Sequence, residues 1–554
     1  MVPERTISEA PQPVSQNTHP IKPDASAPMP PPQVRASAGT AGREIELKLH
    51  VAPSDLARLA RHPALVGLQQ GTAASTRLYT VYFDTPDLRL ASFGVALRVR
   101  RQGSQYIQTV KTLGGGNSGD AAAVAVRREW DWPITGEDPD VSLLTLDGIR
   151  DLVPQDALPE IRPLFTTDFQ RTTLMLRPDP LTAIEVALDT GEIRAGTTYR
   201  PISEIELELK AGPVTALFDL ARDLQRIVPM RISADNKALA GFALVTGRLP
   251  EPAKASPLGL TPAATVADGF RHIVRNCMSH VLANEACVLA GGSDEGIHQM
   301  RVALRRLRSA FGLFDDIIAS GDAKALKDEA RWLRDRLGPA RDWDILHHRF
   351  FQPYAEKHGH DEAIHQLGQA ISSSRRSAHA RASEALYSPR YTTLMLALGS
   401  WLESGRWQED ADQETLAKAA QPLQDIAGAW LGERHRKSRK AGRQIRKIDG
   451  EQRHRLRISF KKLRYGVEFF RGVYPAVSVR PYLEKVEALQ ESLGDLNDAD
   501  VSNQLLKALV DDASKDVKTA AKGLCQWLER HARRRTDGLP GQWIEFEKAK
   551  PFWE

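Results

Sequence analysis

Charged and apolar side chains alternate in a short segment near the start of the chain. Within residues 44–49, Glu44, Glu46 and Lys48 take every second position. Successive side chains of a β-strand point to opposite faces, so these three would share one face and the apolar residues the other. An ordinary half-buried strand with a solvated polar face has the same pattern, so this segment alone does not define a site.

The same alternation recurs in later segments. Arg98 and Arg100 would share one strand face, and Glu204, Glu206 and Glu208 would share another. Further charges in such positions are Lys111, Arg127, Glu129, Asp131 and Lys210. If the apolar faces pack outward against helices, the charged faces line a central cavity. Because unpaired buried charge is costly, such a cavity must bind something charged.

The residue types indicate which charged ligand this is. Arginine and lysine suit phosphate oxygens. Paired glutamates suit a hard divalent cation such as Mg²⁺, which prefers carboxylate, water and phosphate oxygens. Acids and bases together therefore predict a metal-bound polyphosphate and phosphoryl chemistry that works by charge neutralisation and positioning.

The elements that would position these residues are short strands with a period of two. Their spacing predicts an antiparallel barrel or sandwich, with helices expected at 53–62, 214–228 and 237–246. The expected strands are 44–50, 78–84, 95–101, 106–112, 124–132, 167–176, 182–188 and 203–209.

The composition is that of a globular protein. The 554 residues are 42% apolar and 26% charged, and the net charge of +5 is small, so any basic surface must be local. Three cysteines cannot form a disulfide framework and fit a reducing compartment. The N-terminus lacks the pattern of a signal peptide, and no run of 18 apolar residues occurs. We therefore expect a cytoplasmic protein without a membrane partner.

Composition also divides the chain. Residues 1–41 are rich in proline, alanine, serine and glutamine and predict a disordered tail. The strand-rich domain is expected at 43–247, a proline-containing linker at 248–262, an all-helical domain at 263–536 and a C-terminal tail at 537–554.

The helical domain contains an internal repeat. Residues 298–308 match 454–464, and residues 337–344 match 493–500. Both matches have the same offset of 156 residues (454 minus 298, and 493 minus 337). Two matches in one register predict a helical bundle built from two related halves with twofold symmetry. These halves would be about 263–420 and 421–536.

Each half of the repeat carries a basic stripe. Residues spaced i, i+3, i+7 and i+10 lie along one side of a helix. The two stripes are His298, Arg301, Arg305 and Arg308, and His454, Arg457, Lys461 and Arg464. A dense basic run nearby includes Arg436, Arg439, Lys440 and Arg443. Since like charges at this spacing destabilise a helix, their accumulation predicts a polyanionic partner.

Several residues of this domain have a second interpretation. The histidines could instead cap helices or form structural salt bridges. Asp342, Asp344, Asp498 and Asp500 could bind a metal ion, but aspartates beside arginines more often neutralise them or cap helices. No nucleophile motif is evident, so the sequence favours binding over catalysis here.

The strand-rich segment, about 43–247, resembles the CYTH superfamily of triphosphate tunnel metalloenzymes. The similarity begins at Glu44-x-Glu46-x-Lys48. It continues through Arg98-Val-Arg100, Lys111, Arg128-Glu129-Trp130-Asp131, Arg171, Asp189, Glu204 to Glu208, and Lys237. This resemblance implies an eight-stranded antiparallel tunnel (a β-barrel) that hydrolyses triphosphates with Mg²⁺ or Mn²⁺.

The resemblance also implies roles for individual residues. The metal ligands would be Glu44, Glu46, Glu206 and Glu208, assisted by Asp189. Glu129 would be a metal ligand or a salt-bridge partner, and Glu204 could lie at the rim. The phosphate ligands would be Lys48, Arg98, Arg100, Lys111, Arg171 and Lys237. Many members have a second basic residue two positions before that of Arg171, where this chain has Phe169.

Residues 263–536 resemble a CHAD domain, through His298-x-x-Arg301-x-x-x-Arg305 and its counterpart starting at His454. Such domains are helical, often follow a CYTH domain and are associated with inorganic polyphosphate, so association with polyphosphate granules is possible. The two resemblances together imply an inorganic triphosphatase that cleaves tripolyphosphate and carries a domain for long-chain polyphosphate.

Two other functions fit the same residues. One is a triphosphatase for another substrate, such as thiamine triphosphate or a nucleotide. The other is a non-catalytic scaffold that binds polyphosphate or RNA. The basic run has little aromatic interleaving, which argues against a nucleic-acid partner.

Overall fold

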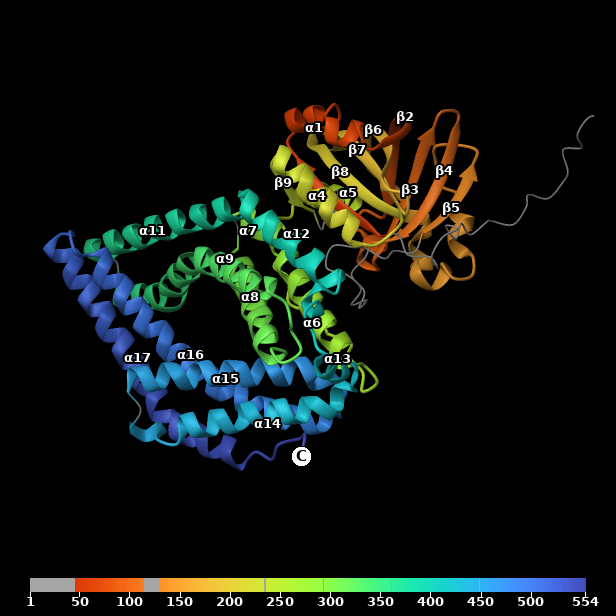
Figure 1. The fold of residues 1–554 in the computed structure, drawn as a ribbon. Coiled ribbons are helices and arrows are strands. Elements are labelled where there is room, and N and C mark those ends of the chain that lie inside the picture. The colour runs from red at the N-terminus through yellow and green to blue at the C-terminus, as the bar shows by residue number, and fades with distance from the viewer. Residues whose placement is uncertain (1–44, 114–128, 234–235, 292, 360, 448) are drawn as a thin grey trace, which may run out of the picture.

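The computed structural model contains an antiparallel sheet domain followed by an all-helical domain (Figure 1). It describes residues 45–113, 129–233, 236–291, 293–359, 361–447 and 449–554. Glu44 and Arg127 therefore lie outside the described residues, as does the expected tail at 1–41.

The sheet has nine strands in the order β5-β4-β3-β2-β6-β7-β8-β1-β9, with antiparallel pairing throughout. The strands are β1 (Glu46–Val51), β2 (Gln69–Asp84), β3 (Val95–Gln102), β4 (Gln105–Thr112), β5 (Glu129–Ile134), β6 (Arg162–Asp179), β7 (Thr182–Ala195), β8 (Thr198–Ala211) and β9 (Met230–Ile232).

The prediction of an eight-stranded barrel is wrong in its strand number. The ninth strand, β9, pairs with β1 at the edge of the sheet, and three residues are too few to show a period of two. Within the described ranges, β5 and β9 form the two ends of the strand order.

The alternation predicted from the sequence sets the two faces of β1 and β8. Leu47 and Leu49 are buried in the core together with Ile205 and Leu207 of β8. Helix α4 (Thr215–Ile227) contributes Leu217 and other apolar side chains to the same core. The charged residues between them face the opposite side.

The remaining helices of this domain are α1 (Pro53–Leu59), α2 (Pro63–Val66), α3 (Arg89–Ser92), α5 (Lys237–Thr246) and 3₁₀ turns at Val141–Thr145, Arg150–Leu152 and Gln155–Glu160.

Residues 248–262 hold neither helix nor strand and lead into the helical domain. Its helices are α6 (Val266–Leu282), α7 (Glu285–Leu289), α8 (Asp294–Leu313), α9 (Asp322–Asp344), α10 (Gln352–His358), α11 (Glu362–Tyr387), α12 (Pro389–Glu403), α13 (Gln413–Ala420), α14 (Leu423–Gly442), α15 (Gly450–Phe470), α16 (Ala476–Leu509) and α17 (Lys515–Lys548). A π-helix, Ile345–Phe351, continues α9, and 3₁₀ turns lie at Arg406–Gln408, Ile445–Lys447 and Arg471–Val473.

We placed the end of the helical domain at residue 536, but helix α17 continues through this position to Lys548. Leu539, Trp543 and Phe546 are buried on it, so residues 537–548 belong to the packed helix rather than to a tail. No helix in the described part of the chain is long and apolar enough to cross a membrane.

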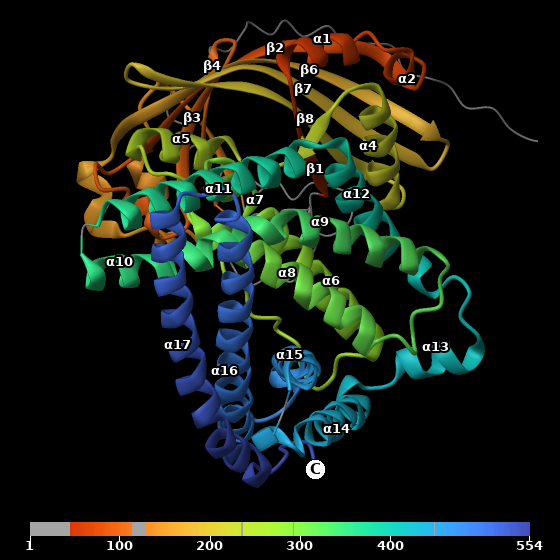
Figure 2. The same cartoon turned by 90° about the vertical axis from the view of Figure 1, so that its left-hand side faces the viewer.

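The repeated segments occupy corresponding elements. Residues 298–308 lie on α8 and 454–464 on α15, and the second pair of segments lies on α9 and α16. Helix α8 packs on α9, α15 packs on α16, and α8 also contacts α15 (Figure 2). A twofold symmetry between the halves stays a prediction.

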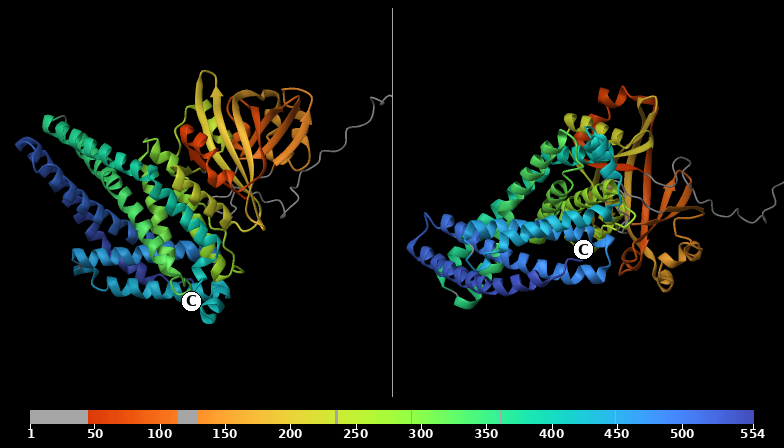
Figure 3. Two further views of the ribbon diagram at one scale, coloured as in Figure 1. Left: turned by 45° about the horizontal axis from the view of Figure 1, so that its top comes forward. Right: turned by 60° about the horizontal axis from the view of Figure 1, so that its bottom comes forward.

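The two domains contact each other where the sheet ends. Strand β9 and helix α4 pack on α12 (Figure 3). The Thr392 hydroxyl donates a hydrogen bond of 2.7 Å to the Met230 carbonyl. Arg231 pairs with Glu285 at 2.8 Å, and the Tyr391 hydroxyl donates to the same carboxylate at 2.9 Å. Since β9 is hydrogen-bonded to β1, the helical domain supports the strand that carries Glu46 and Lys48.

Candidate active site

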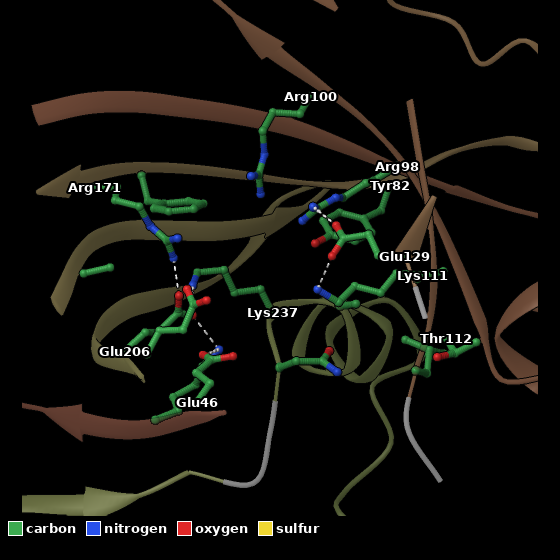
Figure 4. A pocket seen from close by; sticks show the side chains of 18 of the residues that line it. Glu46, Tyr82, Arg98, Arg100, Lys111, Thr112, Glu129, Arg171, Glu206 and Lys237 are labelled. Carbon is green, nitrogen blue, oxygen red and sulfur yellow. Dashed lines mark hydrogen bonds and ion pairs between the residues drawn. The ribbon is translucent and has the colours of Figure 1, made fainter. Parts of the chain in front are cut away.

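A cavity of about 280 Å³ lies on the charged side of the sheet (Figure 4). It collects side chains from β1, β2, β3, β4, β5, β6, β7, β8 and the start of α5. Its charged lining residues are Glu46, Lys48, Arg98, Arg100, Lys111, Glu129, Arg171, Glu185, Glu206, Glu208 and Lys237. Except for Glu185, these are predicted site residues. Asp189, also predicted, is buried beside the cavity, where it contacts Arg171 and Lys237.

Carboxylates gather on one side of this cavity. Oxygens of Asp189, Glu204 and Glu206 all lie within 4.8 Å of one another. Asp189 is fully buried, and Arg171 donates to both of its oxygens, with Nε at 2.8 Å and Nη2 at 2.6 Å. Lys237 Nζ lies 2.6 Å from Asp189 and also contacts Glu204 and Glu206.

Lys237 is placed by the start of helix α5. The side chain of Asn236 caps that helix by accepting a hydrogen bond from the Leu239 backbone N–H at 2.8 Å. Gly247 ends the helix in the left-handed conformation, with φ of 62°. These caps fix the first residue of the helix, so Lys237 enters the carboxylate cluster from a rigid element.

The cluster shifts the proton affinities of its members. Burial alone would lower the pKa of Lys237, but the charges of Glu206, Glu204 and Asp189 overcome this and raise it. Burial would raise the pKa of Glu206, but Lys237, Lys48 and Arg171 hold it well below its usual range. Against the effect of burial, Lys237 and Lys48 lower the pKa of Glu204 as well, so both glutamates are ionised at neutral pH.

The other side of the cavity is mainly basic. Glu129 accepts hydrogen bonds from Arg98 at 2.9 Å and from Lys111 at 2.8 Å. These three residues lie apart from Glu206 and Arg171 in Figure 4. Of the two roles expected for Glu129, the geometry favours the salt-bridge partner.

Among the cavity's arginines, Arg100 has the positive charge that nearby carboxylates compensate least. Its Nε donates to the Thr80 hydroxyl at 3.1 Å, and within the described ranges it forms no ion pair. Burial, and then the nearby charge of Arg98, lower its pKa to about 10. An anion in the cavity would relieve both effects, so Arg100 is suited to contact a bound phosphate.

Glu204, Glu185 and Tyr82 were not predicted as site residues, although Glu185 and Tyr82 line the cavity. Glu204 was expected at the rim, yet it is only 5% exposed and contacts Lys237 and Lys48. Its place in the alternation with Glu206 was the signal that could have identified it. Tyr82 also lines the cavity, and a single tyrosine in a strand carries no comparable signal.

The remaining predicted acids lie less deep. Glu46 and Glu208 line the cavity, and β1 and β8 place them directly opposite each other. Glu208 pairs with Lys210 at 2.6 Å. Phe169, which stands where many relatives have a basic residue, lies with its ring 4.8 Å from Lys237 Nζ and 5.7 Å from the Arg171 guanidinium carbon. The aromatic ring at this position thus stabilises the charges of Lys237 and Arg171, where a basic residue would have added a third positive charge.

The donor set fits a divalent metal ion. Asp189, Glu204 and Glu206 offer only carboxylate oxygens, which hard ions such as Mg²⁺ and Mn²⁺ prefer. Their negative charge is compensated by lysine and arginine side chains. A bound metal ion would compensate part of the same charge, and its phosphate ligand would then contact those basic side chains.

A second cationic centre forms in the helical domain, where α8 meets α15. Burial and mutual repulsion lower the pKa of Arg301 to about 10 and of Lys461 to about 6. The same causes lower the pKa of Arg457, with Arg305 among its neighbours. Their hydrogen-bond acceptors are neutral: the Arg334 carbonyl for Arg301, the Tyr465 hydroxyl for Arg305 and the Asn497 amide for Arg457.

Two stripes thus meet in one surface, but not every member joins it. His298 lies near Arg305 and Arg301, and burial and these arginines lower its pKa to about 3. Arg464 instead pairs with Glu468 at 2.7 Å and with Glu487 at 3.2 Å. The exposed members of the predicted set are Arg308, His454, Arg436, Arg439, Lys440 and Arg443.

Comparisons with known proteins agree with this division. The CYTH domain family matches residues 42–242, and the CHAD domain family matches 272–507. An inorganic triphosphatase of Haemophilus influenzae is 34% identical over 204 residues, which are 36% of this chain and 55% of that protein. The chain thus spans about half the length of that relative.

Two further relatives cover the helical part. An uncharacterized protein of Mycobacterium tuberculosis is 25% identical over 80% of this chain and 84% of its own length. The crystal structure of a CHAD domain from the plant Ricinus communis is 31% identical, covers 54% of this chain and 98% of its own, and has a TM-score of 0.48. The chain therefore consists of a CYTH domain at residues 42–242, similar to an inorganic triphosphatase, followed by a CHAD domain at residues 272–507.

Proposed function

We propose that the CYTH domain hydrolyses inorganic tripolyphosphate to pyrophosphate and phosphate with Mg²⁺ or Mn²⁺. The observation that carries this proposal is the cavity itself, which sets a buried carboxylate cluster opposite a group of arginines and lysines. A triphosphate with a divalent cation is complementary to both sides.

The chain's own residues would divide the work between binding and alignment. Arg98, Arg100 and Lys111 would bind phosphate oxygens on the basic side. Glu206 and Asp189, with Glu46, Glu208 and Glu44 as further candidates, would hold the metal ion. When bound, that ion supplies charge neutralisation on the phosphates and lowers the pKa of water. Lys48, Arg171 and Lys237 would keep the carboxylates in place and bind phosphate when the metal ion takes over their charge.

The inorganic substrate is favoured over thiamine triphosphate or a nucleotide by the lining of the cavity. Eleven of the lining residues that the structure describes are charged, and only Tyr82 and Phe169 among them are aromatic. Phosphate release should therefore be measured with tripolyphosphate, ATP and thiamine triphosphate in parallel. Preference for ATP or thiamine triphosphate would overturn the inorganic substrate and leave the triphosphatase.

We further propose that the CHAD domain binds long-chain polyphosphate through Arg301, Arg305, Arg457 and Lys461. Three clustered arginines whose hydrogen-bond acceptors are neutral, with Lys461 beside them, need a polyanionic partner to compensate their charge. An Arg301→Gln/Arg457→Gln double variant should lose most of the affinity for polyphosphate, measured by titration calorimetry. Arg390→Gln/Arg406→Gln, at exposed positions outside the basic run, is the matched control.

The scaffold hypothesis predicts polyphosphate binding without turnover of any triphosphate. The ionised carboxylates of the cavity favour the enzyme instead. Competition of RNA against polyphosphate, repeated at several salt concentrations, separates a polyphosphate site from a nucleic-acid site. The cytoplasmic location, and any association with polyphosphate granules, stay predictions.

A further inference from the structure

A second group of potential metal ligands lies in the helical domain, away from the cavity. Asp294 opens helix α8, Asp344 ends α9, and His379 lies in the middle of α11. One ligand atom from each lies within 4.8 Å of the other two. Helix α9 packs on both α8 and α11 (Figure 2), so residues distant in sequence meet at one point.

Asp344 is the most informative member. Its side chain is only 1% exposed. One carboxylate oxygen lies 2.7 Å from His379 Nε2, but the buried Oδ2 has no hydrogen-bond partner in the described part of the chain. Leaving a buried carboxylate oxygen unsatisfied is costly, so this atom indicates a missing ligand.

The local backbone supports the same conclusion. Directly after Asp344, α9 continues as the π-helix Ile345–Phe351, a rare conformation that often occurs at functional sites. The wider turn brings His348 Nε2 to 2.5 Å from Asp294, while His348 Nδ1 lies 2.9 Å from the Gln352 side-chain oxygen. A ring hydrogen-bonded through one nitrogen and directed at a site through the other is typical around bound metals.

Arg375 currently neutralises the two aspartates. Its Nε donates to Asp344 at 2.8 Å, and its Nη2 contacts Asp294. The guanidinium is thus a cation in the position where a metal ion would compensate the same charges. The side chain is 26% exposed, so it has room to swing toward solvent.

We propose that Asp294, Asp344 and His379 bind a divalent first-row transition-metal ion that joins α8, α9 and α11. Two carboxylates and one imidazole suit Zn²⁺ and its neighbours better than Mg²⁺, which prefers oxygen ligands alone. The site is separate from the cavity of the CYTH domain. By fixing the start of α8, it positions the helix that carries Arg301 and Arg305.

The test uses the full-length protein after treatment with a chelator. Equilibrium dialysis against Zn²⁺ should show one bound ion fewer in His379→Ala and in Asp294→Asn than in the unaltered protein. His365→Ala, an exposed histidine of the same helix, is the control and should bind as many ions as the unaltered protein. The cavity is the same in all these proteins, so its own metal ions do not affect the difference.

Two further readouts distinguish a metal site from a network of ion pairs. Co²⁺ should give visible absorption that His379→Ala loses, because a mixed nitrogen and oxygen site differs from the all-oxygen set of the cavity. Arg375→Met should raise the affinity for Zn²⁺ by about tenfold, because it removes a competing positive charge.

Equal Zn²⁺ binding by the unaltered protein, His379→Ala and Asp294→Asn would overturn the proposal. So would an Arg375→Met variant that melts at a lower temperature and is not restored by Zn²⁺. If His379→Ala does not fold, Asp294→Asn decides the question, because its side chain is 21% exposed and tolerates the substitution better.

Discussion

At the scale of single residues, each buried charge of the cavity depends on its neighbours. Lys237 is surrounded by Asp189, Glu204 and Glu206, and despite burial the pKa of Lys237 is raised while that of Glu206 is lowered by their mutual attraction. Removing one partner therefore affects the others. Mutating a residue of this cluster should therefore change catalysis more than mutating a residue of an exposed ion pair would.

Substitution of Glu204 tests whether the buried charges depend on one another, because the structure alone shows that this residue contacts Lys237 and Lys48. Glu204→Gln should lower kcat for tripolyphosphate by about a hundredfold, since it loosens Lys237 and removes one possible metal ligand. Glu192→Gln, on the half-exposed pair with Arg194, is the control and should keep full activity. Unchanged kinetics in Glu204→Gln would remove that residue from the site.

Lys461 gives the polyphosphate surface a dependence on pH. Its pKa in the folded protein is lowered to about 6, so the amine is mostly neutral at neutral pH. A bound polyanion favours the charged form, so binding should take up about one proton at about pH 7.5 and weaken as the pH rises. Titration calorimetry in buffers of different ionisation enthalpy measures this uptake.

Lys461→Met is the matching control for that experiment. The variant should bind polyphosphate without the additional proton and with a flatter pH profile. Proton uptake that is equal in the variant and the unaltered protein would assign it to another group.

At the scale of elements, the amino-acid pattern determined most of the sheet. A period of two identifies strands with one charged and one buried face, and helix α5 was predicted at its observed bounds, Lys237–Thr246. Strand β9 was missed because three residues show no period. That Glu204 belongs to the buried carboxylate cluster depends on how the strands curve and pair, which one sequence does not contain.

Gly191 shows how closely two strands approach beside the cavity. It lies opposite Phe169, and a Cβ there would be 2.1 Å from the Asp168 carbonyl oxygen. Gly191→Ala should therefore lower the free energy of unfolding by about 1–3 kcal/mol in urea denaturation. It should also displace Phe169 from Arg171 and Lys237. Gly136→Ala, where nothing lies within 4 Å, should leave the stability nearly unchanged.

At the scale of the whole molecule, the two domains share a polar contact. Glu285 is buried between Arg231 of β9 and Tyr391 of α12, and β9 is paired with β1. The helical domain therefore supports one edge of the sheet. The sequence predicted both domains but not this contact, because Glu285 and Arg231 belong to no motif.

Glu285→Ala should weaken this contact by about 3 kcal/mol, because it leaves a charged arginine and a buried hydroxyl without their partner. Scanning calorimetry should then resolve separate melting transitions for the two domains. Glu329→Ala, which breaks the exposed pair with Arg390, should cost less than about 1 kcal/mol. A single unshifted transition in Glu285→Ala would show that other contacts join the domains.

The central claim, that the cavity hydrolyses inorganic tripolyphosphate, is tested most directly by ³¹P NMR of the reaction. Full-length protein with Mg²⁺ or Mn²⁺ should convert tripolyphosphate to equal amounts of pyrophosphate and phosphate. A chelator, or the Glu206→Gln substitution in the carboxylate cluster, should abolish this conversion. No conversion by the unaltered protein with either metal, or full conversion by Glu206→Gln, would contradict the account.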